Sequence, residues 1–213
     1  MKPIGPLMWE HRLIEKMLRC FEGETKKIAE QKKINPLFVD TAVDFIRTYA
    51  DRTHHGKEED ILFRDLIKKQ LSREHTRIME ELVEEHIKGL IIKKTLANIL
   101  ARPACMSIIV LCRDYYETVN KYARKTVGML VDAKERYLRG ENTSQEVVAL
   151  LRELAHFYPI HIEKEDKHFF YPCMEYFTPE EQDKMLAEFY EFDRKMIHEK
   201  YGKIVNQIES QSV

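Results

Sequence analysis

Apolar residues recur every three or four positions through most of this sequence, which is the period of an amphipathic α-helix. The pattern predicts five long helices, over about 7–22, 36–69, from 72 onward, 143–172 and 178–208. Ser72, Thr143 and Thr178 stand at three of the predicted starts, where a side-chain oxygen can accept a hydrogen bond from a free backbone N–H. Gly23 is expected to end the first helix and Pro172 the fourth.

The scarcity of turn residues argues against an all-β fold. The 213 residues include seven glycines and seven prolines, about half of the usual share, whereas sandwiches and barrels need many Gly/Pro turns. Charged residues make up 33% of the chain, which suits the solvent-facing sides of long helices. The length is enough to close a real hydrophobic core. We therefore expect a single all-α domain over residues 1–213.

Charge, hydropathy and cysteine placement exclude several classes of protein. Lys plus Arg number 35 and Asp plus Glu 36, so the net charge of −1 gives no general attraction to nucleic acid or to an anionic membrane. The longest nearly apolar run, 104–112, is far shorter than the roughly 20 residues of a spanning helix. The N-terminus lacks a signal-peptide core, and the four cysteines form no CxxC pair. We expect a cytoplasmic protein without a disulfide framework or a thiolate zinc site.

The stretch from about 89 to 140 is less regular than the rest. It contains Pro103, and residues 106–111 are apolar on all sides. One interpretation is that this stretch forms an extra helical pair covering the bundle, with an insertion over about 90–123. The other is a contact between two copies of the chain in a homodimer.

Two segments share the pattern His-x-x-x-Glu-Asp: one begins at His55 and the other at His161. Residues i and i+4 of a helix project from the same face, so His55 with Glu59, or His161 with Glu165, can reach one metal centre. Two such helices facing each other supply two imidazoles and two carboxylates. Carboxylates can bridge a pair of metals about 3.5–4 Å apart. The repeated pattern therefore predicts a two-metal site.

His11 and His86 continue the apolar stripes of the first and third helices. A single histidine on such a stripe is more often a hydrogen-bonded core residue than a ligand, because a buried imidazole needs a partner of some kind. Four helices that each aim a histidine inward, two of them with Glu four residues later, favour a bound metal pair.

The position of the first motif is ambiguous, because His54 with Glu58 has the same spacing as His55 with Glu59. Leu62 shares a face with the second pair, while the apolar residues upstream follow a different phase. A helical bulge near residue 56 would reconcile the two phases, and such bulges are common at functional sites.

Five segments together resemble the hemerythrin family, specifically the hemerythrin-like HHE cation-binding proteins of bacteria and archaea. They are EHRLIE (10–15), HHGKEEDILF (54–63), EH (85–86), YPIHIEKED (158–166) and EFDRKMIHEKY (191–201). The resemblance covers most of the chain except about 90–123. It implies an up-down four-helix bundle around a non-haem diiron centre, with an additional C-terminal helix over about 179–210.

The resemblance also implies a ligand set, in which Glu59 and Glu165 bridge the two irons. The set is His11, His55, Glu59, His86, His161 and Glu165. Hemerythrins use five histidines, so His198 of the last helix is the expected fifth, although the apolar stripe there lies about 100° away. His168 and Glu15 fall near the site face, where His168 is expected to pack at the bundle end and Glu15 to form a surface ion pair.

A centre of five histidines and two carboxylates makes the two irons unequal and leaves one of them an open position, with an oxo or hydroxo bridge between them. The resemblance therefore implies binding of O₂, NO or peroxide for storage, sensing or delivery. The alternatives are an enzyme that consumes peroxide or NO, an iron-handling repair protein, and a metal-free helical scaffold that binds a partner. Iron suits mixed imidazole and carboxylate ligands, while zinc and manganese stay open.

Overall fold

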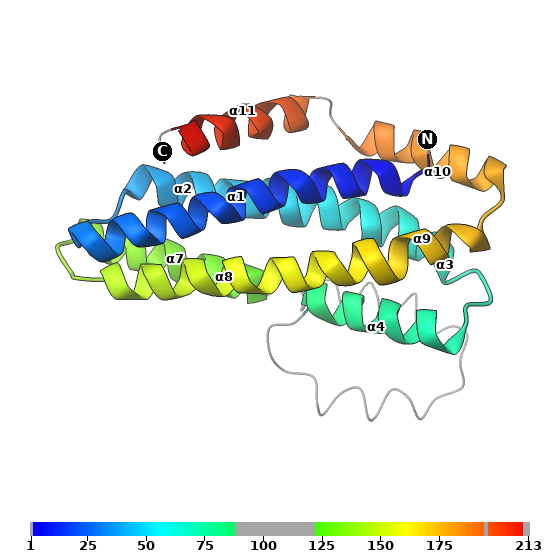
Figure 1. The fold of residues 1–213 in the computed structure, drawn as a ribbon, viewed down its shortest axis with the longest axis horizontal. Coiled ribbons are helices and arrows are strands. Elements are labelled where there is room, and N and C mark those ends of the chain that lie inside the picture. The colour runs from blue at the N-terminus through cyan, green and yellow to red at the C-terminus, as the bar shows by residue number, and fades with distance from the viewer. Residues whose placement is uncertain (1, 88–121, 194–195, 211–213) are drawn as a thin grey trace.

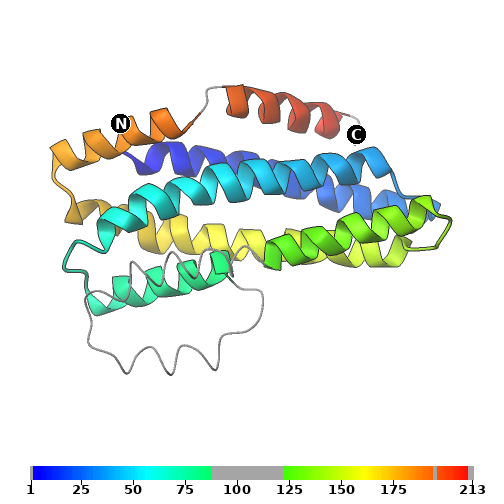
Figure 2. The same ribbon diagram turned by 180° about the vertical axis from the view of Figure 1, so that it is seen from behind.

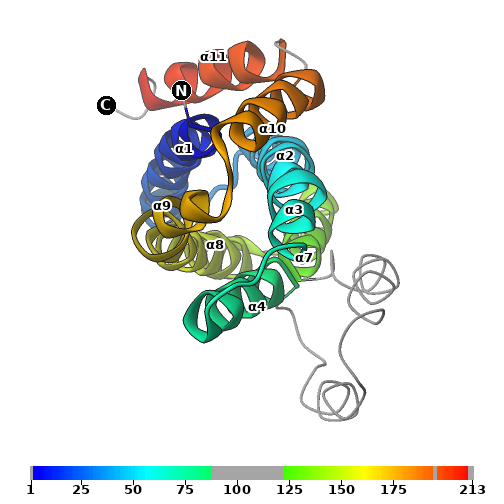
Figure 3. The ribbon, with the colours of Figure 1, turned by 90° about the vertical axis from the view of Figure 1, so that its right-hand side faces the viewer.

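The computed structural model describes residues 2–87, 122–193 and 196–210, and within these ranges every regular element is a helix (Figure 1). Viewed end-on, α1, the α2–α3 segment and the α8–α9 segment surround a common interior, α4 and α7 complete the ring, and α10 and α11 lie outside it (Figure 3). Of the helices in the described ranges, none is both long and apolar enough to cross a membrane.

Helix α1 spans Ile4–Gln31, well beyond the predicted end at Gly23. It continues because its buried face continues, through Thr25 and Ile28. The helix ends at Lys32, which adopts a left-handed conformation with φ 55° and donates its N–H to the Ile28 carbonyl at 2.9 Å. The predicted glycine stop was wrong because burial of the following turn outweighs the modest helix penalty of one glycine.

The second long helical segment is continuous in path but alternates between α-helical and π-helical winding. It consists of α2 (Pro36–Asp44), η1 (Phe45–His55), η2 (Glu58–Phe63) and α3 (Arg64–Leu66). Asn35 caps its start by accepting from the Phe38 N–H at 3.3 Å. Both η1 and η2 are π-helical, with hydrogen bonds to the fifth residue back instead of the fourth.

Helices α4 (Arg73–Ile87) and α7 (Tyr122–Leu138) lie along the remaining side, α4 toward the α3 end and α7 toward the opposite end (Figure 2). Val127, Leu130 and Ala133 of α7 are completely buried against α2 and α8. Helix α7 is therefore part of the core, which corrects the expectation that the 89–140 stretch only covers the bundle. The apolar run at 104–112 and the dimer contact expected there lie outside the described residues.

The fourth segment begins with α8 (Ser144–Lys164) and continues through η3 (Glu165–Phe169), α9 (Phe170–Cys173) and η4 (Met174–Tyr176). The π-helical turn η3 starts at the glutamate of the second His-x-x-x-Glu motif. The capping box expected at Thr143 does not form, because the Thr143 hydroxyl donates to the Ala133 carbonyl at 2.7 Å and so ties α8 to α7. Helix formation continues past Pro172 by one short turn.

The C-terminal region contains two helices where the sequence predicts one. Helix α10 (Pro179–Phe192) begins with the expected capping box between Thr178 and Glu181. It ends at Asp193, whose extended backbone (φ −75°, ψ 104°) breaks the helix, and α11 (Met196–Ser210) follows. Helix α10 packs on η2, while α11 packs on α1 and η1.

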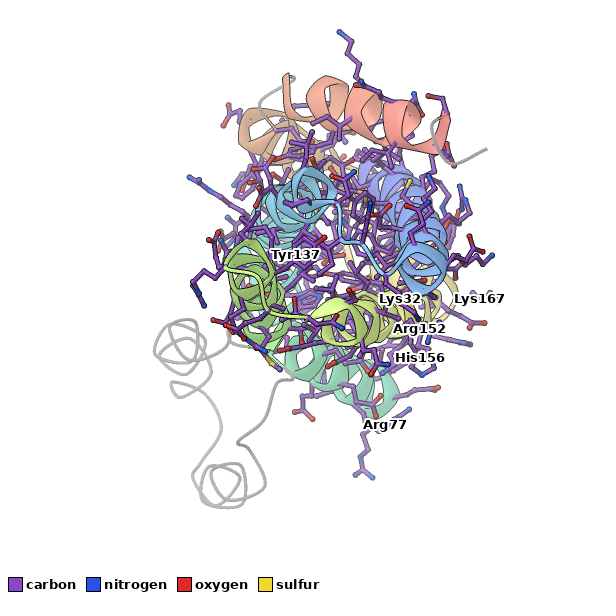
Figure 4. All side chains as sticks on the ribbon, turned by 90° about the vertical axis from the view of Figure 1, so that its left-hand side faces the viewer. Lys32, Arg77, Tyr137, Arg152, His156 and Lys167 are labelled. Atoms are coloured by element: carbon purple, nitrogen blue, oxygen red, sulfur yellow. The ribbon has the colours of Figure 1, made fainter. Side chains whose placement is uncertain are left out.

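The apolar core consists of two clusters, one toward the α7 end and one toward the α9 end. On α1, Leu7 belongs to one cluster and Leu13 to the other, with His11 between them. The same layering holds along α8 and η3, where His161 lies between Tyr158 of one cluster and Phe169 of the other. A layer of polar side chains is thus enclosed between two apolar cores. Side chains fill the interior between the helices, whereas Arg77 and Lys167 point outward (Figure 4).

Candidate metal centre

The enclosed polar layer holds two adjoining groups of potential metal ligands, whose atoms within each group lie no more than 4.8 Å apart. The two-histidine group consists of His11, His54, Glu58 and Glu165. The three-histidine group consists of His55, His86 and His161. Together they contain five imidazoles and two carboxylates from α1, the second helical segment, α4 and the α8–η3 segment.

His54 and His55 both face the cluster, so the choice that the sequence left open does not have to be made. The His54 ring lies edge-on to His11 of α1, with centroids 4.5 Å apart, while the His55 ring stacks on His86 of α4 at 4.2 Å. Adjacent residues of a helix point about 100° apart, which here directs them to neighbouring helices. The Thr53 hydroxyl donates to the Thr48 carbonyl five residues back, at 2.7 Å, within this π-helical segment.

The two central carboxylates each face both groups, one oxygen to each. Glu165 Oε2 lies 3.2 Å from His11 Nε2, and Glu165 Oε1 lies 3.3 Å from His161 Nε2. Glu58 Oε1 lies 3.4 Å from His54 Nε2, and Glu58 Oε2 lies 3.4 Å from His86 Nε2. Ligand atoms about 2.1 Å from one metal ion are about 3 Å from each other. These spacings are therefore close to those of two coordination shells that share the two carboxylates.

Glu59, expected to be a bridging carboxylate, lies behind the cluster. Its Oε1 is 2.9 Å from His86 Nδ1, the ring nitrogen that faces away from the centre. The reason is the phase of the π-helical segment, which turns Glu58 into the centre and the next residue toward α4. The structure thus places Glu58 where the sequence predicted Glu59.

Each imidazole has a carboxylate on its outer nitrogen. The pairs are His11 with Asp166 at 2.8 Å, and His54 with Glu10, His86 with Glu59 and His161 with Glu85 at 2.9 Å. A fifth, His55 with Asp51, is longer at 3.7 Å. A carboxylate at Nδ1 accepts a hydrogen bond from the N–H there and leaves the Nε2 lone pair for a metal ion, which is the usual support of a metal-binding histidine.

Three of these outer carboxylates are paired in turn with a cation: Asp166 with Arg12, Glu10 with Lys57, and Glu85 with Lys164. A cation beside a carboxylate favours its ionised form, which is the better acceptor for an imidazole N–H. The cluster therefore has three layers, with the Nε2 atoms inside, the carboxylates around them and the cations outside.

Four dipeptides build this arrangement, each with one residue in the cluster and its neighbour supporting a histidine on another helix. They are Glu10-His11, Glu58-Glu59, Glu85-His86 and Glu165-Asp166. Sequence reasoning missed the supporting role of Glu10, Glu85 and Asp166. The signal that could have found them is an acidic residue directly beside His11, His86 and Glu165.

Several polar atoms at the centre of the cluster need a hydrogen-bonding partner or a metal ion that the described side chains do not supply. Both oxygens of Glu58 and of Glu165, and the Nε2 of His55, are buried without receiving or donating a hydrogen bond within the described residues. The Nε2 atoms of His11 and His54 face each other at 2.8 Å. A buried polar group without a partner costs about 2–7 kcal/mol. The residues present fit a bound cation, which would satisfy all of these atoms together.

Burial disfavours charged imidazoles and lowers the pKa of His54 and of His55 well below the usual range. For His11 burial acts in the same direction, but the hydrogen bond to Asp166 and the nearby carboxylate of Glu165 outweigh it and raise its pKa to about 10. In the metal-free chain, the proton on the His11 ring thus supplies positive charge that a bound metal ion would otherwise bring.

The two central carboxylates differ in pKa although both are fully buried. Burial, with the nearby charge of Glu165, raises the pKa of Glu58 well above its usual range. Burial also acts to raise the pKa of Glu165, but the imidazoles of His161 and His11 outweigh it and lower that pKa well below the usual range. If the neighbouring carboxylates of Glu58 and Glu165 were both ionised, their repulsion would be costly without a cation between them.

Aromatic rings enclose the imidazoles. Phe170 stacks on His11 with centroids 5.6 Å apart, Phe63 on His86 at 5.7 Å, and Phe157 on His161 at 5.7 Å. Tyr158 lies parallel to His55 at 6.4 Å. These rings hold the imidazole planes and exclude water from the cluster.

The remaining expected residues are not part of the described cluster. His168 is exposed, and Glu15 forms the expected surface ion pair with Arg12 at 3.1 Å. His198 is in α11, but its side chain lies outside the described residues. Five histidines meet at the cluster without it.

Comparison of the chain with protein-family models, with curated proteins and with solved structures finds no match.

Proposed function

We propose that this chain is a hemerythrin-like protein that holds two iron ions and binds O₂, NO or peroxide at one of them. The observation that carries the proposal is the division of five histidines into groups of two and three, joined by two carboxylates that each face both groups. The order of the helices fits an up-down four-helix bundle, with α4 and α7 together as its third helix and 88–121 as the insertion between them.

The three-histidine group and the two shared carboxylates would offer one ion five protein ligands, while His11 and His54 with the same carboxylates would hold the other. A pair of iron ions held there supplies redox equivalents and a coordination position for a small ligand. Glu58 and Glu165 would hold both ions, and the outer carboxylates would keep each Nε2 directed inward. The stacked phenylalanines exclude water, which favours reversible binding over turnover.

The metal-free scaffold is the weaker alternative, because a chain without a metal function has no need to bury two carboxylates and five imidazoles between apolar cores. Replacing such groups with apolar residues is often neutral or stabilising. Imidazole and carboxylate ligands together suit iron, with manganese and zinc as the competing ions.

The direct test is anaerobic loading with Fe(II), measurement of iron per chain, and an absorption spectrum before and after O₂ is added. Two irons per chain and a charge-transfer band that disappears under vacuum would establish reversible O₂ binding. Two irons with rapid irreversible oxidation would favour the enzyme alternative. A chain that retains no iron would refute the proposal.

The fifth histidine can be tested by comparing His54→Ala with His198→Ala. We expect His54→Ala to retain about one iron per chain, because the two-histidine group loses half of its imidazoles, and His198→Ala to retain two. Iron quantification after gel filtration measures both. Full occupancy in His54→Ala together with loss in His198→Ala would restore the ligand set expected from the sequence.

A further inference from the structure

We propose that Lys57 is a positioning residue that couples metal binding at the two-histidine group to the docking of the end of α10. The inference rests on the proposed function, since it concerns the same cluster. It adds a connection from that cluster to the C-terminal helices, through four buried side chains in series.

The series begins at His54 and ends at Asp193. His54 Nδ1 donates to Glu10 Oε2 at 2.9 Å, and the other oxygen of Glu10 pairs with Lys57 Nζ. Lys57 Nζ also donates to Asp193 Oδ2 at 2.6 Å. Glu10 and Lys57 are completely inaccessible, and the Asp193 side chain is 9% exposed. The second helical segment, α1 and the end of α10 thus meet at one buried ammonium group.

Lys57 lies between the cluster residues His55 and Glu58, on the side of the helix that faces α10. The same side includes Gly56, where a Cβ atom would approach Phe192 Cζ to 2.9 Å. The Phe189 ring lies under Lys57 Nζ, 6.0 Å from its centroid. The helical turn that carries the candidate ligands His55 and Glu58 therefore also contacts the C-terminal end of α10.

A buried ammonium group is strongly disfavoured unless anions surround it. Lys57 has an anionic partner on each side, one tied to the cluster and the other to α10. A metal ion on His54 Nε2 would polarise the ring and strengthen the bond from Nδ1 to Glu10, which holds Glu10 against Lys57. Lys57 then stays directed at Asp193. By linkage, docking of Asp193 must favour metal binding by the same factor.

Lys164 provides a matched control on the other group. It pairs with Glu85, which supports His161, so the chain of contacts has the same form. The side chain of Lys164 is 22% exposed, however, and its other partner, Glu81, lies on α4. Within the described residues, both ion-pair partners of Lys164 therefore lie on α4 and neither lies on α10.

The experiment is hydrogen exchange of the full chain, metal-free with a chelator and loaded with Fe(II) under anaerobic conditions, read at the amides of residues 186–193. We expect loading to slow exchange there by about fivefold or more, the lower end of common coupling factors. Lys57→Met should reduce the ratio of the two rates to near one, and Lys164→Met should preserve it.

Lys57→Met removes the buried ammonium group between Glu10 and Asp193 and risks misfolding, so Asp193→Asn serves as the second variant. It keeps the pair between Lys57 and Glu10 and weakens only the tie to α10, and it should also bring the ratio near one. Phe192→Ala removes an apolar contact of the same helix end, so both rates should rise while their ratio persists.

Wild-type chain that binds two irons without any slowing at 186–193 would overturn the coupling and leave the proposed function intact. The coupling is equally overturned if Lys57→Met and Asp193→Asn both keep the full ratio. Wild-type chain that binds no iron would instead refute the proposed function, and the coupling with it.

Discussion

Glu58→Gln is expected to weaken metal binding by more than about 100-fold and to leave at most one iron per chain. Both oxygens of Glu58 face Nε2 atoms, one in each group, and the side chain is fully buried. An amide offers one acceptor oxygen and no charge, so it cannot neutralise or bridge two cations. Titration of the metal-free chain with Fe(II), with iron quantified per chain, measures the effect.

Glu59→Gln is the matched control, because the neighbouring residue has the same chemistry in a different place. Glu59 supports His86 from behind and its side chain is 22% exposed. Losing such a support usually lowers metal affinity by about 10–100-fold, and we expect the low end because water can replace it. An equal or larger loss in Glu59→Gln than in Glu58→Gln would contradict the placement of the two carboxylates.

The metal-free form of Glu58→Gln separates folding from binding. Burial raises the pKa of Glu58 because its charged form is disfavoured there. A neutral amide avoids that burden, so the metal-free variant should unfold at a urea concentration no lower than the metal-free wild type. A marked drop in its urea midpoint would mean that Glu58 serves the fold and not a cation.

Metal removal is the second large effect that we expect. With free metal at 1,000 times its dissociation constant, binding stabilises the native state by about 4 kcal/mol. For a chain of 150–250 residues each kcal/mol shifts Tm by about 2–4 °C. The loaded chain should therefore melt about 8–16 °C above the chelator-treated chain, as followed by circular dichroism under anaerobic conditions.

The control for this shift is Glu58→Gln, whose shift should be at most about one third as large, because a site weakened about 100-fold is only about 10-fold above its dissociation constant at the same free Fe(II). His168→Ala changes an exposed histidine of the same segment as His161 and should keep the full shift. A wild-type Tm that does not respond to Fe(II), Mn(II) or Zn(II) would leave the buried imidazoles without a metal function.

The helices themselves were predictable because apolar periodicity is a local property of the sequence. The starts at Ser72 and Thr178 were right for the same reason, since a cap depends on residues within one turn. The ends were less predictable. Gly23 does not stop α1, and Asp193 interrupts the last helix, because these outcomes depend on what lies against each turn.

The residue types at the cluster were also largely readable from the sequence. Histidines are rare on apolar stripes, so the helical pattern by itself singles out His11, His86 and His161, and all three lie in the cluster. The Glu165 carboxylate followed from its spacing to His161. These residues could be found because each lies on a single helix face with a regular phase.

The tertiary structure alone decided between Glu58 and Glu59 and placed both His54 and His55 in the cluster. One residue along a helix is a turn of about 100°, so a change to π-helical winding exchanges which neighbour points inward, and local periodicity does not reveal that change. The partners of the outer nitrogens and of Lys57 come from other helices. Such contacts depend on how the helices pack, which no local pattern in the sequence records.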